Sequence, residues 1–180
     1  MSERKTQIIH AATSLFLAEG VGVSTASIAK AAGVSNGTLF NAFATKQALI
    51  DAIYLAAKSA MFAAVPHSGS DSFTRAHLLE NWRGYLAWAR ANPEERAIMH
   101  LLLEAGLTSA ETQAQVDQLA KPSADWIQTA LDTGVIRGPN AGFVGKLIFF
   151  QLDLVITENL HSEEADLAFD MLCTSIGLKS

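Results

Sequence analysis

Residues 24–46 of this 180-residue chain have the sequence STASIAKAAGVSNGTLFNAFATK, which has the composition of two short helices joined by a tight turn. Gly33 separates the two halves, and glycine accepts the positive backbone angle that a sharp corner between helices often requires. The small alanines before it let the two helix backbones approach closely. Ser24 and Ser35 each precede a helix, where a hydroxyl accepts a hydrogen bond from an otherwise unpaired backbone N–H. The stretch therefore predicts two short helices that meet at Gly33.

The second of these helices is expected to turn Leu39 and Phe43 inward, because residues four apart share a helix face. Its outward side chains are small and polar, and such groups contact base edges and phosphates in the major groove of DNA. Thr45 is expected to cap the next helix, where free N–H groups and a lysine in the first turn attract a phosphate. The predicted DNA-binding residues are Ser24, Thr25, Ser35, Asn36, Gly37, Thr38, Phe40, Asn41, Thr45 and Lys46.

Residues 4–49 resemble the DNA-binding head of the TetR/AcrR family of bacterial transcriptional regulators. The resemblance implies a three-helix head, an all-helical C-terminal domain that binds a small molecule, a homodimer formed by the last helices, and repression that the ligand usually relieves. The family usually has tyrosine where this chain has Phe40, and often histidine or tyrosine where it has Ala42. The matching positions are Ile9, Ala12, Leu15, Phe16, Gly20, Ile28, Ala29, Ala32, Gly33, Val34, Ser35, Gly37, Thr38, Leu39, Phe43, Lys46 and Leu49.

Charge is distributed unevenly along the chain, whose net charge is −5. Residues 1–47 contain four basic and two acidic residues, whereas the remainder contains nine basic and sixteen acidic residues. A basic head on an acidic body is oriented toward DNA by its own field. Two excess positive charges give a weak field, so a single head is expected to bind poorly, whereas a dimer doubles the number of phosphate contacts. Two heads are therefore expected to act together.

Other features of the sequence narrow the class of protein. Cys173 is the only cysteine, so no intramolecular disulfide can form. The polar start, MSERKTQ, differs from a signal peptide, and the most apolar run, 147–156, is too short to span a bilayer. The histidines lack metal-ligand spacing, and neither a P-loop nor a GxGxxG motif is present. We expect a cytoplasmic protein that binds no membrane, cofactor or metal and is not an enzyme.

Helical periodicity extends along almost the whole chain, without a sustained two-residue alternation, and predicts an all-α fold. The expected organisation is a helix-turn-helix DNA-binding domain at 1–47, a connecting helix at 48–65, and an effector-binding and dimerisation domain at 66–180, after the turn-rich PHSGSDS. Helices are expected to start at Asn92, with Glu95 completing a capping box, and at Thr108. Pro122 is expected to break or kink a helix. The last two helices are expected at about 140–160 and 162–176.

The second domain contains candidates for a ligand site and for a dimer interface. Bulky residues that could line an apolar pocket are Trp82, Trp88, Met99, Leu103, Trp126 and Phe149, and Asp153 or Glu104 could supply a carboxylate to a cationic ligand. The last two helices offer more apolar surface than one body needs, which predicts a four-helix dimer interface at Phe143, Leu147, Phe150, Leu154, Leu167, Met171 and Leu172. The alternative for both sets is burial in the core of the monomer, with the carboxylates solvated or paired with arginine.

Together these features predict a regulator that binds a pseudo-palindromic operator as a homodimer. The resemblance to the TetR/AcrR family implies that it responds to a small molecule and acts as a repressor. Two other interpretations remain open. An activator would have the same fold. A helical ligand-binding or interaction protein with a weakened DNA head is favoured only by Phe40, Ala42 and the low charge of the head.

Overall fold

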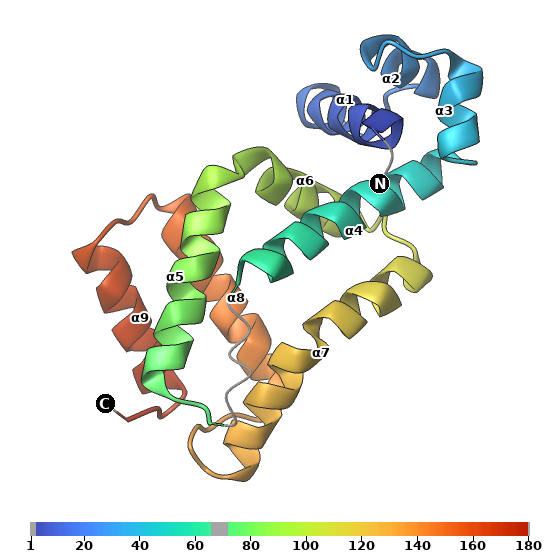
Figure 1. Cartoon of the computed structure of the whole chain (residues 1–180). Helices are drawn as coiled ribbons and strands as arrows, with labels where there is room; N and C mark the ends of the chain where they lie inside the picture. The colour runs from blue at the N-terminus through green and yellow to red at the C-terminus, as the bar shows by residue number, and fades with distance from the viewer. Residues whose placement is uncertain (1–2, 66–71, 180) are drawn as a thin grey trace. The chain divides into compact units, whose positions relative to one another are not determined.

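The computed structural model describes residues 3–65 and 72–179, and within these ranges the regular secondary structure is entirely α-helical (Figure 1). The predicted all-α fold is confirmed. The predicted turn at 66–72 lies, except for Ser72, outside the described residues. The helices are α1 (Glu3–Glu19), α2 (Thr25–Ala31), α3 (Asn36–Ala42), α4 (Lys46–Ala64), α5 (Arg75–Ala91), α6 (Pro93–Glu104), α7 (Ala110–Asp132), α8 (Ala141–Thr157) and α9 (Glu163–Ser175).

The chain packs as two compact units, each made of two segments. The first unit contains residues 1–60 and 92–117, and the second contains residues 61–91 and 118–180. Residues that follow the head by about fifty positions therefore pack in the same unit as the head. The expected ranges 1–47, 48–65 and 66–180 divide the chain by function, whereas the two units divide it by packing. The functional ranges therefore stay a prediction.

The first unit is built around α1, which packs against α2, α3 and α6. Apolar residues of α1 recur with helical spacing, as they must to form a single buried face. The corner between α2 and α3 adds Ile28 and Leu39 to the same core, and both are fully buried. Buried side chains of this core are Ile8, Ala12, Phe16, Ile28, Leu39, Phe43, Leu49 and Ile53.

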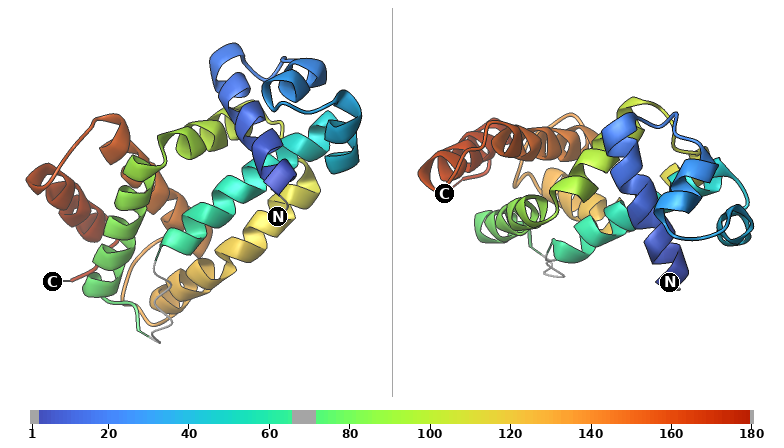
Figure 2. Two further views of the ribbon diagram at one scale, coloured as in Figure 1. Left: turned by 45° about the horizontal axis from the view of Figure 1, so that its top comes forward. Right: turned by 90° about the horizontal axis from the view of Figure 1, so that it is seen from above.

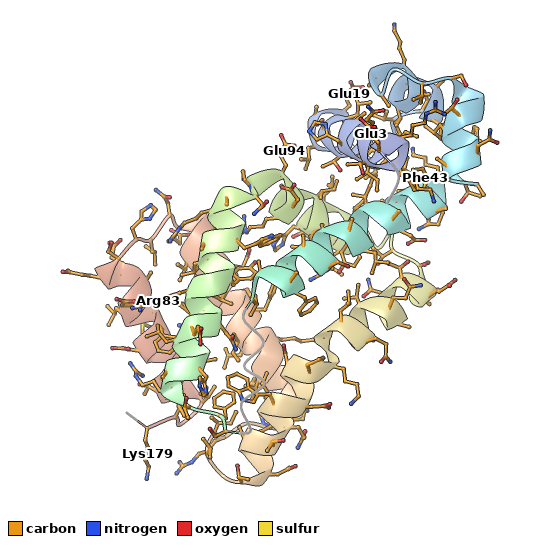
Figure 3. All side chains as sticks on the ribbon, viewed as in Figure 1. Glu3, Glu19, Phe43, Arg83, Glu94 and Lys179 are labelled. Atoms are coloured by element: carbon orange, nitrogen blue, oxygen red, sulfur yellow. The ribbon has the colours of Figure 1, made fainter. Side chains whose placement is uncertain are left out.

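The second unit is organised by α5, which packs against α8 and α9, while α8 and α9 lie side by side (Figure 2). The guanidinium of Arg75 on α5 lies over the ring of Phe169, 5.0 Å from its centroid, and forms an ion pair with Asp170. Arg83 extends from α5 toward α9, where its guanidinium lies 3.3 Å from the carboxylate of Asp166 (Figure 3). Exposed ion pairs thus flank the apolar contact between α5 and α9, where such pairs add little to the stability that the packing provides.

Three expectations about helix ends and interiors need correction. Helix α7 starts after Ser109 and not at Thr108, since Ser109 Oγ accepts the N–H of Thr112 at 3.2 Å. Asn92 precedes Pro93 as expected, but its side chain makes no capping hydrogen bond. Its backbone angles, φ −129° and ψ 60°, differ from the extended conformation in which capping side chains reach the first turn.

Of the two outcomes expected at Pro122, a break or a kink, the break is wrong, since α7 continues to Asp132. A proline leaves the carbonyl four residues earlier without its helical N–H partner. In α7 that carbonyl belongs to Gln118, and both Gln118 and Pro122 are exposed. Water can therefore satisfy the unpaired group, which explains why the helix tolerates the proline.

Candidate nucleic-acid interface

The corner between α2 and α3 is closed by backbone hydrogen bonds around Gly33, whose φ is +66°. The N–H of Gly33 donates to the carbonyl of Lys30 at 3.1 Å, and the N–H of Val34 donates to that of Ala29 at 3.0 Å. This pair of bonds is the Schellman ending of a helix, in which glycine is favoured because it lacks a Cβ. The predicted role of Gly33 as the residue that turns the chain is confirmed.

Serine caps fix the start of both short helices. Ser24 Oγ accepts the N–H of Ser27 at 3.1 Å, and Ser35 Oγ accepts the N–H of Thr38 at 3.0 Å. The hydroxyl of Thr38 also forms a 2.8 Å hydrogen bond with Ser35 Oγ. Both predicted caps are confirmed, and the register of α3 is fixed at its first turn, so that α3 has one defined rotation about its axis.

That rotation buries one face of α3 and exposes the other. Leu39 and Phe43 are 0% and 6% exposed, as expected for the inward face. Phe43 lies where α3 ends beside the start of α4 (Figure 3), with the ammonium of Lys5 5.5 Å from its ring centroid. The opposite face carries Ser35, Asn36, Gly37, Phe40 and Asn41, which are all exposed, while Thr38 is half-buried.

The asparagines of α3 are available for a ligand. Within residues 3–65 and 72–179, neither the Asn36 nor the Asn41 side-chain amide has a hydrogen-bond partner. An asparagine amide offers both a donor and an acceptor, the combination that pairs with the N6 and N7 of adenine. Gly37 lies between them, and a Cβ built there would meet only Ser35 Oγ, at 3.8 Å. The surface of α3 is thus open at Gly37.

The start of α4 has a different chemistry from the one expected. Thr45 caps α4 as predicted, since its Oγ1 accepts the N–H of Ala48 at 3.0 Å. The ammonium of Lys46, however, donates to the carbonyls of Val21 and Val23, each at 2.6 Å, and lies 5.7 Å from the ring centroid of Phe16. Lys46 therefore ties α4 to the loop between α1 and α2. We assign it to positioning the head, in place of the expected phosphate contact.

Side chains of α4 also hold the loop between α6 and α7 in the same unit. Gln47 Nε2 donates to the carbonyl of Leu107 at 2.6 Å, and Asp51 Oδ1 accepts the N–H of Ser109 at 2.9 Å. Sequence reasoning missed both contacts. They join residues separated by about sixty positions, and no local pattern around Gln47 or Asp51 indicates such partners.

The pKa values of two titratable groups of α4 differ from the ordinary values of these groups. Burial lowers the pKa of Lys58, whose ammonium lies 5.7 Å from the ring centroid of Tyr54. Burial also raises the pKa of Tyr54, against a smaller opposing effect of its hydrogen bond with Gln113. Both groups lie more than a turn beyond the predicted DNA-binding residues. They bear on the stability of the first unit and not on the reading of bases.

The predicted ligand-binding residues are divided between the two units. Met99 and Leu103 belong to the first unit, and the other five belong to the second. Trp82, Trp88 and Met99 are buried, whereas Trp126, Phe149 and Asp153 are half-buried. Leu103 is 48% exposed and Glu104 is exposed, so neither lines an enclosed cavity. In the second unit the ring of Tyr85 lies 5.8 Å from that of Phe149 and 5.9 Å from that of Trp88, centroid to centroid.

Trp126 has a different neighbourhood from the other candidates. Its ring stacks on Phe73 with centroids 4.0 Å apart, and its indole N–H donates to the carbonyl of Ser72 at 3.4 Å. Phe73 and Tyr85 are also buried aromatic residues, but the ligand-site candidates predicted from the sequence did not include them. The hollow of about 900 Å³ on the surface of α1 and the smaller one beside the α7–α8 loop contain none of the predicted ligand residues.

The predicted dimer residues fall into two groups. Phe143, Phe150 and Leu154 on α8, with Leu167 and Met171 on α9, are between 46% and 69% exposed, and Leu147 is half-buried. Leu172 is 0% exposed and belongs to the core of the second unit, so its assignment to the interface is withdrawn. The exposed members recur at helical spacing and form one apolar face, which we call the α8–α9 face. Exposed apolar faces of this kind mark interaction surfaces.

A head of three helices, the last two of them short, with a glycine corner and an exposed, hydrogen-bonding face on the last, has the arrangement of a helix-turn-helix DNA-binding domain. Residues 8–53 match the family model of "Bacterial regulatory proteins, tetR family". The match covers the head, and over these residues the chain is similar to the tetR family of transcription regulators. The expected resemblance is confirmed. In the described parts of the chain, no helix is both long and apolar enough to cross a membrane.

Solved structures share the fold over nearly the whole chain. A chain assigned to the tetR family of transcription regulators from Shewanella sp. PV-4 is 23% identical, with a TM-score of 0.85. The match covers 97% of the present chain and 98% of the Shewanella chain. A tetR family transcription regulator from Marinobacter aquaeolei VT8 is 19% identical, with a TM-score of 0.81 and coverage of 96% and 95%. A chain described as superantigen PfiT has a TM-score of 0.70 at 21% identity, with coverage of 96% of both chains. The fold by itself therefore does not specify the function.

Proposed function

We propose that this protein is a ligand-responsive transcriptional repressor that binds a pseudo-palindromic operator as a homodimer. The observation that carries the proposal is the exposed face of α3, where two asparagine amides without internal partners flank an open glycine. Asn36 and Asn41 would read base edges in the major groove, while Gly37 would allow close approach of the DNA. Ser24, Thr25, Ser35, Thr38 and Thr45 would contact phosphates through hydroxyl or backbone N–H groups near helix starts.

Homodimerisation is supported by the α8–α9 face. Phe150 and Met171 are exposed on this apolar face of the monomer, and burying them against a second copy would stabilise a dimer. Two copies related by a two-fold axis would present two α3 helices to the DNA. A pseudo-palindromic site with half-sites about one helical turn apart would follow from that symmetry.

An effector is expected to bind the aromatic part of the second unit. Trp88, Phe149 and Tyr85 lie together on α5 and α8, and Asp153 follows Phe149 by one helical turn. A mainly apolar site with one carboxylate suits an apolar or aromatic cation. Titrating candidate cations while recording tryptophan fluorescence tests this assignment. Phe149→Ala should weaken the response, and Phe143→Ala, on the α8–α9 face, serves as the matched control.

Effector binding would reach the head through α4, which is continuous from Lys46 to Ala64. Gln47 and Asp51 tie the start of α4 to residues 107–109, so the head and that loop would move together. A ligand that favours one arrangement of helices would shift the population of heads spaced for the operator. The double variant Gln47→Ala, Asp51→Ala, with Gln128→Ala as an exposed control, should uncouple effector binding from DNA release. Glycine insertion near Ala57 should do the same.

Sequencing of the DNA bound to the protein in its native cell tests the proposal most directly. Enrichment of one symmetric motif, with a steep dependence of affinity on salt, is the expected result. A reporter under the control of that motif then separates repression from activation by the sign of the change. Absence of any specific complex at low salt would favour the helical interaction protein and would overturn the proposal.

A further inference from the structure

Phe40 is an exposed apolar side chain in the middle of a polar surface. It is 41% exposed, and no other large apolar side chain within residues 3–60 is exposed. The inward positions of the same helix, Leu39 and Phe43, are almost completely buried, so the head has a core that Phe40 does not complete. An aromatic ring on the outer face gains the stabilisation of burial when a partner outside the head covers it, so Phe40 can contribute to the binding of such a partner.

The neighbours of Phe40 indicate what that partner is. Asn36 lies four residues before Phe40, and Gly37 lies three residues before it, so both share its part of the helix surface. Asn41 follows it directly, and all three neighbours are exposed. The ring therefore stands within the row of groups proposed to face base edges, next to the open surface at Gly37. A partner that contacts this row must offer hydrogen-bonding edges and an apolar group side by side.

Thymine in the major groove has this combination. Its O4 accepts a hydrogen bond, and its C5 methyl group is the one apolar group that any base presents there. Asparagine amides cannot detect a methyl group, whereas an aromatic ring can pack on it. The Phe40 ring has no hydroxyl, so it cannot donate a hydrogen bond to a phosphate.

We infer that Phe40 is a specificity-determining residue that recognises the C5 methyl group of one thymine in each half-site. The inference rests on the proposed function, because it requires α3 to lie in the major groove. It assigns Phe40 to base recognition through an apolar contact, beside the hydrogen bonds of Asn36 and Asn41. The thymine is thereby distinguished from cytosine without a further hydrogen bond from this side chain.

Uracil substitution tests the inference, since deoxyuridine differs from thymidine only by the missing methyl group. Each thymine of the selected operator is replaced in turn, at both symmetric positions, and the affinity is measured by fluorescence anisotropy. Transfer of one such group out of water contributes about 0.8 kcal/mol, which is about fourfold in affinity for each half-site and about sixteenfold for the two together. We expect this loss at one symmetric pair of thymines for the wild-type protein.

Variants assign the loss to Phe40. Phe40→Ala should bind the thymine and uracil operators equally, whereas Phe40→Tyr, which keeps the ring, should retain most of the loss. Asn41→Ala is the matched control on the same surface, and it should weaken binding without abolishing the effect of uracil. Because Phe40 is exposed, these variants are expected to fold, which circular dichroism and thermal melting verify.

The outcomes distinguish the inference from the proposed function. Specific binding with no uracil effect at any position would overturn the inference and leave the proposed function standing. The same holds if Phe40→Ala shows the full uracil effect, since the methyl group would then be recognised elsewhere. Failure of the wild-type protein to select any operator would overturn the proposed function, and the inference with it.

Discussion

Phe150→Ala should dissociate the dimer by a large, measurable factor. The Phe150 side chain is 69% exposed in the monomer, more than any other large apolar residue that the structure describes. It lies in the middle of α8 with Phe143 and Leu154 on the same exposed face. If the homodimer proposed above forms through the α8–α9 face, this ring is buried twice, once in each copy.

The magnitude follows from the exposed area. A phenylalanine side chain has roughly 200 Å² of surface, so 69% exposure leaves about 140 Å² to be covered by a partner. At about 25 cal/mol per Å², each ring contributes about 3.5 kcal/mol, and both rings together contribute about 7 kcal/mol. Alanine retains part of this contact, so the expected loss is about 4 kcal/mol, or about a thousandfold increase in the dimer dissociation constant.

Sedimentation velocity over a range of concentrations measures that constant directly. Val135→Ala is the matched control, because Val135 is 40% exposed in the second unit but lies in the α7–α8 loop, outside the α8–α9 face. Operator affinity should fall with dimerisation in Phe150→Ala and stay unchanged in the control. The reasoning is refuted if the wild-type protein is a monomer at tens of micromolar, or if Phe150→Ala dimerises as tightly as wild type.

Four further predictions concern single residues. Gly37→Ala should raise the stability in thermal melts by about 0.5 kcal/mol, because alanine favours a helix and its Cβ has room there. The same variant should weaken operator binding at least about tenfold in a titration, because the Cβ fills the open surface, and an unchanged affinity would contradict close approach of the DNA. Lys46→Met should cost about 2–3 kcal/mol of unfolding free energy through two lost hydrogen bonds, with the salt slope of DNA binding unchanged, whereas a slope smaller by about one would reveal a phosphate contact. Because burial lowers the pKa of Lys58, the unfolded chain binds this proton more tightly than the folded protein, and the stability should rise with pH toward 10.5. In denaturant titrations, Lys58→Met should be more stable than wild type at pH 7 and should lack this rise. A pH profile identical to that of wild type would contradict the prediction. Ser162, at φ 45° and ψ −113°, occupies a conformation suited to glycine, so Ser162→Gly should gain about 1 kcal/mol in urea unfolding, and a loss of stability would mean that the serine side chain matters more than the backbone.

Local interactions made the head predictable from its sequence. The Gly33 corner and the caps at Ser24, Ser35 and Thr45 depend on hydrogen bonds that span at most five residues, and each formed as expected. Where local signals competed, prediction was less accurate. Thr108 and Ser109 are both capping residue types, and only the conformation of the loop selects Ser109.

Contacts between distant segments were not predictable in the same way. Nothing near Lys46 indicates that its ammonium will bind the carbonyls of Val21 and Val23. The burial of the last helix shows the same limit. Met171 and Leu172 are adjacent apolar residues, yet one is 59% exposed and the other is completely buried.

The sequence by itself determined that the chain is helical, where its head turns and which residues can form hydrogen bonds on the outer face of α3. These properties depend on backbone propensity and on groups within one or two helical turns. Tertiary structure decided which apolar residues are core and which remain exposed on α8 and α9. Tertiary structure also decided that the Lys46 ammonium donates its hydrogen bonds to carbonyls within the head. The reason is that burial depends on the rotation of each helix against its packing partners, which lie far away in the sequence.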